Sequence, residues 1–69
     1  MRRGELRIGV VIPCFNAERY LAQTISSVLI QSYAAAEIVI IDDGSTDGSL
    51  TIARQYEASF PEVVRVYAE

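Results

Sequence analysis

Two short apolar runs, separated by a stretch with helical spacing, constrain the fold of this chain more than any other feature. The first run, Ile8–Ile12, is β-branched apart from Gly9, and the second, Glu37–Ile41, is β-branched after its first residue. Near-continuous apolarity is typical of a strand that is covered on both faces, as in a parallel sheet. Pro13 has no amide donor and is expected to end the first strand. The pattern therefore predicts two buried strands.

The segment between the two runs, residues 17–32, has the spacing of an amphipathic helix. Asn16 is a suitable N-cap for this helix, and Glu18 in its first turn suits the positive end of the helix dipole. Mostly apolar side chains then recur at intervals of three and four, which places them on one face. They are Tyr20, Leu21, Thr24, Ile25, Val28 and Leu29. With a short connection at residues 33–36, this helix links the two strands in parallel.

A turn, a second helix and a third strand follow. The segment Asp42–Gly48 is the strongest turn signal in the chain, and Ser45, Thr46 or Asp47 can cap the helix after it. The residues that line this helix are Leu50, Ala53, Tyr56 and Phe60, and Pro61 lies just beyond its end. Val63–Val66 reads as a third strand.

The predicted order is strand, helix, strand, helix, strand. With right-handed crossovers this gives an α/β fold, the parallel three-stranded half of a doubly wound, Rossmann-like sheet with strand order 3-2-1. We expect one domain over residues 1–69, with a flexible tail at 1–7. The first strand leaves an apolar edge free, and such an edge is an association site. The chain is therefore expected to be a piece of a longer protein or to self-associate.

Composition removes several classes of function. The chain has 69 residues, one cysteine, no histidine and a net charge of −3. An internal disulfide, histidine catalysis and the usual structural zinc sites are excluded, and the charge argues against nucleic-acid binding. No apolar run approaches the ~20 residues of a membrane span, and no signal peptide is evident, so a cytoplasmic location is expected. Arg2, Arg3 and Arg7 form a basic cluster, read as a solvated tail or as a surface for anionic lipid or another subunit.

The candidate ligand site lies where the first two strands end. Ligands of open α/β sheets bind outside the carboxyl ends of the strands, which here are Pro13–Asn16 and Asp42–Ser45. Neither segment is a dinucleotide fingerprint, because the first has no glycine, and the absence of lysine excludes a P-loop. Cys14 has no histidine partner and is expected to be a buried thiol. The two tips are predicted to lie side by side and to hold a polar ligand, most plausibly a nucleotide.

Each side chain at the tips has two readings. An ionised Asp42 or Asp43 offers only acceptors, so it can receive a uracil ring N–H or a ribose hydroxyl. Alternatively, both carboxylates only cap the turn and the next helix. Phe15 can stack on a base or pack in the core. The amides of residues 16–18 suit an anion, although the charge of Glu18 partly offsets this.

Three stretches together resemble the N-terminal segment of family 2 glycosyltransferases, inverting enzymes with the GT-A (nucleotide-diphospho-sugar transferase) fold. They are Val10–Glu18, Tyr20–Tyr33 and Glu37–Ser49. The resemblance implies a hexosyltransferase-type enzyme that transfers sugar from a nucleotide-sugar donor, commonly a UDP-sugar, to an acceptor. It also implies a nucleotide site with Asp43 accepting a hydrogen bond from the base. The residues carried over to that site are Pro13, Phe15, Asn16, Glu18, Asp43, Gly44 and Ser45.

The same resemblance limits what this chain is expected to do. The D-x-D-type motif and the catalytic carboxylate of the family have no counterpart here, so no catalytic or metal-binding residue is predicted. Mg²⁺ or Mn²⁺ is expected only for the full-length enzyme, and the chain alone is expected to be inactive. The alternative is a non-catalytic nucleotide-binding or self-assembly module that keeps only the fold. A different protein with a flavodoxin-like or Rossmann-like half is disfavoured by the missing glycine loop.

Overall fold

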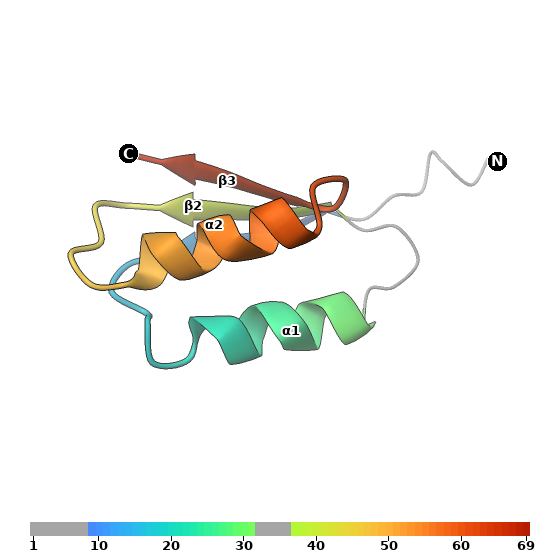
Figure 1. Ribbon diagram of the computed structural model, residues 1–69, viewed down its shortest axis with the longest axis horizontal. Coiled ribbons are helices and arrows are strands. Elements are labelled where there is room, and N and C mark those ends of the chain that lie inside the picture. Colours follow the sequence, from blue (N-terminus) through green and yellow to red (C-terminus); the bar gives the residue numbers. More distant parts are fainter. Residues whose placement is uncertain (1–8, 32–36) are drawn as a thin grey trace, which may run out of the picture.

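A computed structural model describes residues 9–31 and 37–69 of the chain. The elements in order are β1 (Gly9–Cys14), α1 (Leu21–Gln31), β2 (Glu37–Asp42), α2 (Ser49–Ser59) and β3 (Val64–Ala68). All strands are parallel and form one three-stranded sheet with the order β1-β2-β3 (Figure 1). The predicted α/β class and strand order are therefore confirmed. The predicted tail, its arginine cluster and the connection at 33–36 lie outside the described residues.

The register of the sheet brings the carboxyl ends of the strands together. Cys14 of β1 lies opposite Asp42 of β2, and Asp42 lies opposite Ala68 of β3. The ladder continues one step beyond the strands, because the Asp43 amide donates to the Cys14 carbonyl at 3.0 Å. The two strand tips are thus neighbours, as the sequence predicts.

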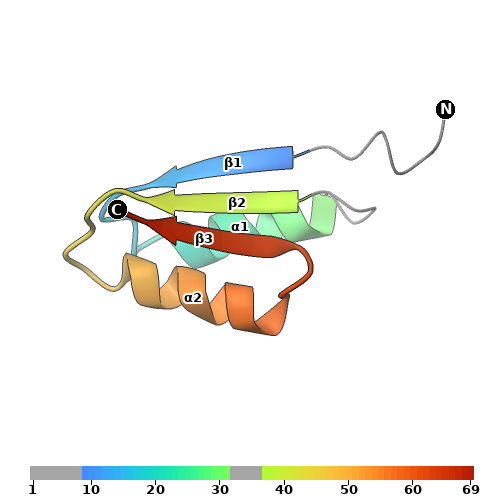
Figure 2. The same cartoon turned by 90° about the horizontal axis from the view of Figure 1, so that it is seen from above.

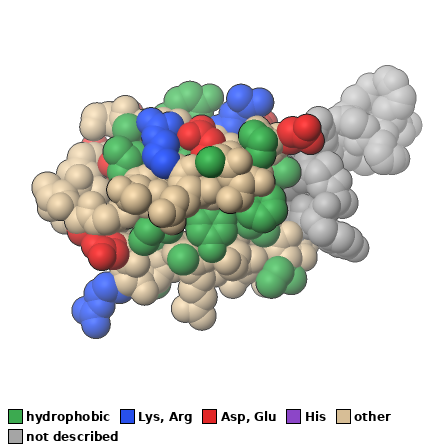
Figure 3. All heavy atoms as spheres, in the orientation of Figure 1, with side chains coloured by type: hydrophobic (Ala, Val, Ile, Leu, Met, Phe, Trp, Pro, Cys, Tyr) green, Lys and Arg blue, Asp and Glu red, His purple; other side chains and the backbone are tan. Residues whose placement is uncertain are grey.

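Both helices cover the same face of the sheet (Figures 1 and 2). The core between the two layers centres on Ile25 of α1 and on Ile38 and Ile40 of β2, all with 0% exposure. Burying an isoleucine side chain stabilises the fold by about 1.5–3 kcal/mol. On the outer surface, apolar side chains also gather between α1 and α2 (Figure 3), where Ser26 and Tyr56 share a hydrogen bond of 2.8 Å.

The prediction that the first strand is covered on both faces is wrong. Ile12 and Cys14 face the helices and are buried, whereas Val11, which precedes Ile12, is 60% exposed. Two right-handed crossovers that step in the same direction place both helices on one side of the sheet. The other face of the sheet is covered by no described element (Figure 2) and is here called the bare face. The side chains on it include Val11, Pro13, Val39, Ile41 and Tyr67.

Element boundaries also differ from the predictions. Pro13 does not end β1, which continues to Cys14, because β1 is an edge strand where a missing amide needs no partner. Helix α1 begins at Leu21 rather than at residue 17. Gly48, rather than Ser45, Thr46 or Asp47, is the N-cap residue of α2. The third strand is shifted by one residue at its start and two at its end.

Candidate functional site

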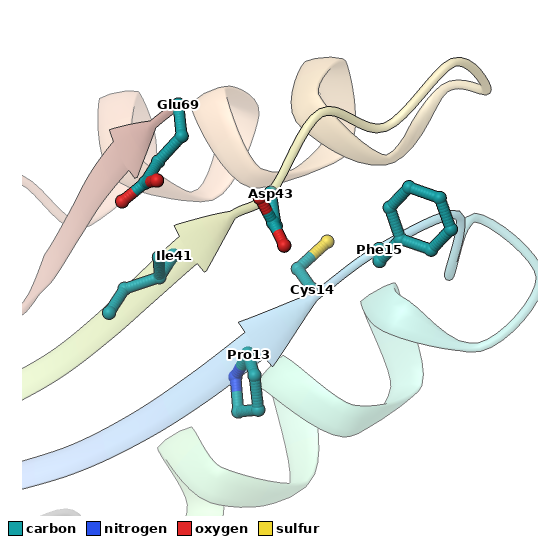
Figure 4. Close-up of a pocket in the computed structure, with 6 residues that line it drawn as sticks. All are labelled: Pro13, Cys14, Phe15, Ile41, Asp43 and Glu69. Atoms are coloured by element: carbon teal, nitrogen blue, oxygen red, sulfur yellow. The ribbon is translucent and has the colours of Figure 1, made fainter.

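A hollow of ≈ 370 Å³ lies at the carboxyl edge of the sheet (Figure 4). From the predicted site it is lined by Pro13, Phe15 and Asp43, and Cys14, Ile41 and Glu69 complete it. Pro13, Ile41 and Asp43 follow the alternation of their strands onto the bare-face side. The hollow is therefore the corner at which the bare face meets the carboxyl edge.

Sequence reasoning missed Glu69 as a lining residue. Its amide donates to the Asp42 carbonyl at 2.9 Å, which extends the ladder between β2 and β3 and brings Glu69 to the same edge. The signal that could have found it is the third strand itself, because the residue after its last ladder position reaches the edge where the other tips lie.

Phe15 presents its ring at this edge instead of packing in the core. Its exposed fraction is 60%, so the core-packing reading is wrong. In Figure 4 the ring stands beyond the end of β1, on the same side of Cys14 as the turn that follows Asp43. An exposed aromatic face of this kind can stack on a planar ligand.

Asp42 and Asp43 have opposite environments although they are adjacent. Asp42 is 2% exposed on the helix side, where its Oδ2 accepts from the Ser45 amide at 3.2 Å and its Oδ1 from the Cys14 thiol at 3.5 Å. Asp43 is exposed on the other side, and within the described part of the chain its carboxylate makes no hydrogen bond. Strand alternation, applied to both residues, would have predicted this division.

Hydrogen bonding and burial set the protonation of this pair of groups. Hydrogen bonds from Ser45, from its hydroxyl first, hold the pKa of Asp42 below its ordinary value. Burial, the largest cause, raises the pKa of the Cys14 thiol. Asp42 is therefore a carboxylate committed to the turn, and Cys14 is a neutral buried thiol, as expected from the sequence.

Asn16 is not the N-cap of α1. Its backbone is left-handed, with φ 49°, and its Oδ1 accepts from the Thr46 amide of the facing loop at 2.8 Å. Its own amide donates to the hydroxyl of Ser45 at 2.9 Å. Gly44 also has a positive φ, 76°, which a turn after Asp43 requires and which glycine adopts without steric cost. Of the predicted site residues, Asn16 and Ser45 thus join the two loops, whereas Gly44 shapes the turn.

Glu18 lies at the N-terminus of the other helix, not in the first turn of α1. Its Oε1 accepts from the Gly48 amide at 2.7 Å, and its own amide donates to Asp47 Oδ2 at 3.1 Å. The Ala17 amide donates to the buried hydroxyl of Ser49 at 2.7 Å. The amides of residues 16–18, which the sequence suggested for an anion, are therefore all engaged by the facing loop.

The metal and membrane predictions concern only the part of the chain that the structure describes. Residues 9–31 and 37–69 include no group of three or more Cys, Asp or Glu side chains placed to hold a metal ion. The described side chains thus do not fit a metal site. Neither α1 nor α2 is long and apolar enough to cross a membrane.

The chain has parallel strands, both helices on one face and an open polar corner at the strand tips. These are the features of half of a doubly wound α/β sheet. The sequence matches the model of the family described as "Glycosyl transferase family 2" over residues 9–69. The chain therefore belongs to glycosyl transferase family 2, which confirms the resemblance drawn from its motifs.

Individual relatives agree with this assignment. EpsE of Bacillus subtilis (strain 168), which is named as a glycosyltransferase, is 42% identical over 60 residues, or 87% of this chain and 22% of EpsE. Glycosyltransferase GlyA of Streptococcus pneumoniae is 40% identical over 50 residues, which cover 72% of this chain and 7% of GlyA. Chondroitin synthase of Escherichia coli is 36% identical over 56 residues, which cover 81% of this chain and 8% of the synthase. The match also spans 17% of the glycosyltransferase YibD of Escherichia coli, so this chain covers a fifth or less of most of these relatives and 22% of EpsE.

Proposed function

We propose that this chain is the part of a glycosyltransferase that recognises the nucleoside of a nucleotide-sugar donor, with UDP-sugars as the donor class. One observation carries the proposal. At the corner hollow, an aromatic ring (Phe15) and a carboxylate without a protein partner among the described residues (Asp43) stand together in the open. Family membership supports a nucleotide-sugar donor in general, and the hollow offers a place for the base of that donor.

The chemistry of the two side chains favours a uracil base. An ionised carboxylate only accepts hydrogen bonds, so Asp43 selects a ring that presents an N–H. Stacking of a base on an aromatic side chain contributes about 1–3 kcal/mol. The hollow of ≈ 370 Å³ is within the roughly 300–1,000 Å³ of small-molecule pockets. The nucleoside end of the donor therefore fits this corner.

The diphosphate and the sugar are placed outside the two loops in this proposal. The amides of residues 16–18 and of Gly48 already donate to side chains of the protein, so they are not free to bind phosphate. A nearby Glu18 carboxylate further disfavours an anion there. A base for the acceptor hydroxyl and a Mg²⁺ or Mn²⁺ ion for the leaving diphosphate belong to the full-length inverting enzyme in this scheme.

Isothermal titration with UDP and CDP tests the proposal directly. The two nucleotides are matched in size, but cytosine has an acceptor where uracil has its ring N–H. We expect UDP to bind and CDP to bind at least about tenfold more weakly, and we expect Asp43→Ala to remove most of this preference. Cooperative melting is recorded first, so that binding is measured on folded protein. Equal affinity for UDP and CDP would contradict the assignment of Asp43.

The chain by itself is proposed to be inactive in sugar transfer. In this proposal Asp43 contacts the base of the donor and Asp42 is committed to the turn, so neither serves as the base for an acceptor hydroxyl. The assay measures release of UDP from UDP-sugars in the presence of the purified chain. Turnover of any UDP-sugar would disprove this statement. Two relatives are named for chondroitin and teichuronic acid synthesis, which makes a growing saccharide the acceptor class to test with a longer protein.

Self-association is a second candidate, favoured by the bare face and by the edge of β1. Val11 and Tyr67 on this face are 60% and 56% exposed, and β1 pairs only with β2 among the described elements. A second copy that pairs along β1 would satisfy the backbone groups of the edge. Sedimentation across a concentration series should then reveal a dimer, whereas a monomer at all concentrations would reject self-association.

A cytoplasmic, reducing location is part of the proposal. The free buried thiol of Cys14 accords with it.

A further inference from the structure

Glu18 and Gly48 form a hydrogen bond between the loop after β1 and the loop after β2. The residues are 30 positions apart, and the Glu18 Oε1 accepts from the Gly48 amide at 2.7 Å. The amide of Glu18 donates back to Asp47 of the same loop at 3.1 Å. The negative carboxylate also lies at the N-terminus of α2, where the helix dipole favours it. The contact therefore fixes the loop after β1 against the loop after β2.

The glycine at position 48 is explained by this contact and not by its backbone. Its φ is −83°, which any residue can adopt. A Cβ at this position would instead meet Glu18 Cδ at 3.2 Å and its two carboxylate oxygens at 3.3 and 3.4 Å. These distances are tighter than ordinary van der Waals contact, so a side chain at 48 would push the carboxylate out of place. The absence of a side chain keeps room for Glu18.

We propose that the Glu18–Gly48 contact is a positioning device for the nucleoside hollow, with Glu18 as its positioning residue. This inference rests on the proposed function. The loops that carry Phe15 and Asp43 are joined at the sheet by the bond from the Asp43 amide to the Cys14 carbonyl. At their far ends they are joined by Glu18 and Gly48. Fixing both ends holds the ring and the carboxylate at one separation before a ligand arrives, which lowers the ordering cost of binding.

The test compares Glu18→Ala, Glu18→Gln and the matched control Ile25→Val by UDP titration and thermal melting. Glutamine keeps the Oε1 acceptor, so Glu18→Gln should retain affinity within about twofold, whereas Glu18→Ala should weaken UDP binding about fivefold. Ile25 is fully buried within α1 and does not line the hollow, so Ile25→Val should lower the melting temperature and leave affinity unchanged. Loss of affinity in Ile25→Val equal to that in Glu18→Ala would overturn the proposal, because the effect would then follow stability alone.

Gly48→Ala disturbs the same contact from the opposite loop. It should weaken UDP binding by itself, and the double variant with Glu18→Ala should bind no more weakly than Glu18→Ala alone, because both changes remove one interaction. Additive losses would overturn the shared contact.

A readout without ligand separates failure of this inference from failure of the proposed function. If UDP does not bind the folded protein, the proposed function fails. Amide NMR then tests separately whether the Glu18–Gly48 contact holds Phe15 and Asp43 in position. Glu18→Ala should speed hydrogen exchange at the Gly48 amide and move the amide signals of Phe15 and Asp43, whereas Glu18→Gln should do neither. Unchanged Phe15 and Asp43 signals in Glu18→Ala would overturn it.

Discussion

The two halves of the strand-tip edge differ in how their polar groups are used. In the outer half, side chains and amides of residues 16–18 and 45–49 hydrogen-bond to each other. Examples are the bonds from the Thr46 amide to Asn16 and from the Gly48 amide to Glu18. In the inner half, next to the sheet, Phe15 and Asp43 are exposed and lie at the hollow. One edge thus contains a frame of groups that are bonded to one another, which Asp42 joins through Ser45, and an exposed surface, Phe15 and Asp43, where we propose the nucleoside site. Being polar at a strand tip does not by itself make a residue a ligand contact.

Asp42 belongs to the frame and Asp43 to the exposed surface, although the two residues are adjacent. Their alanine variants should show the largest difference in the free energy of unfolding. Asp42→Ala should lower the free energy of unfolding by about 3 kcal/mol, because it removes a charged acceptor and leaves the Ser45 amide unpaired in a partly buried site. Asp43→Ala should change it by no more than about 0.5 kcal/mol, as for other exposed sites. Urea unfolding of both variants measures this difference, and equal losses would remove the distinction between frame and surface.

Phe15 should show the reverse behaviour of a frame residue. Phe15→Ala is expected to weaken UDP binding by about 2 kcal/mol, or roughly thirtyfold, through lost stacking. Its ring is 60% exposed, so the unfolding midpoint should stay near that of the unaltered chain. Phe15→Tyr, which keeps an aromatic face, is the matched control and should bind normally. Titration gives the affinity for UDP, and urea unfolding of the same samples gives the stability. A loss of stability without a loss of affinity would mean that Phe15 is a structural residue and not a ligand contact.

Asn16 tests the frame at a smaller scale. Asn16→Ala should cost about 2 kcal/mol or less, since it removes the acceptor for Thr46 and also places alanine at φ 49°. Asn16→Gly removes only the acceptor and should cost about 1 kcal/mol, because glycine adopts this φ freely. A larger loss for glycine than for alanine would mean that the left-handed backbone is not the source of the difference.

Acid should weaken the frame, because carboxylates within it have lowered pKa values in the folded state. The pKa of Asp42 is lowered by the Ser45 hydroxyl first, and that of Asp47 by the Ser49 hydroxyl first. A carboxylate whose pKa is lower in the folded state stabilises the protein above its unfolded pKa, and this stabilisation is lost as the pH falls through the folded pKa. The urea midpoint should therefore decline below about pH 4. Asp42→Asn should flatten the decline, and a decline as steep as that of the unaltered chain would contradict this role of Asp42.

Local patterns in the sequence were enough to predict the strands, their order and the meeting of the two tips. Those features depend on β-branched runs and on helical spacing between them, which neighbouring residues determine. The start of α1 at Leu21 could not be predicted in this way, because the Ala17 amide is engaged by Ser49, 32 residues later. The role of Glu18 at the start of α2 was missed for the same reason. An apolar run such as Ile8–Ile12 also does not reveal which face the helices will cover.

The position of the hollow at a corner ties ligand binding to whatever packs on the sheet. Pro13 and Ile41 belong both to the bare face and to the wall of the hollow. A layer placed over Val11 and Val39 would continue into the roof above the base. Assembly and nucleotide occupancy would then share one surface, and each would strengthen the other through ordinary thermodynamic linkage. A layer packed on the bare face would thus complete the hollow as well as cover the sheet.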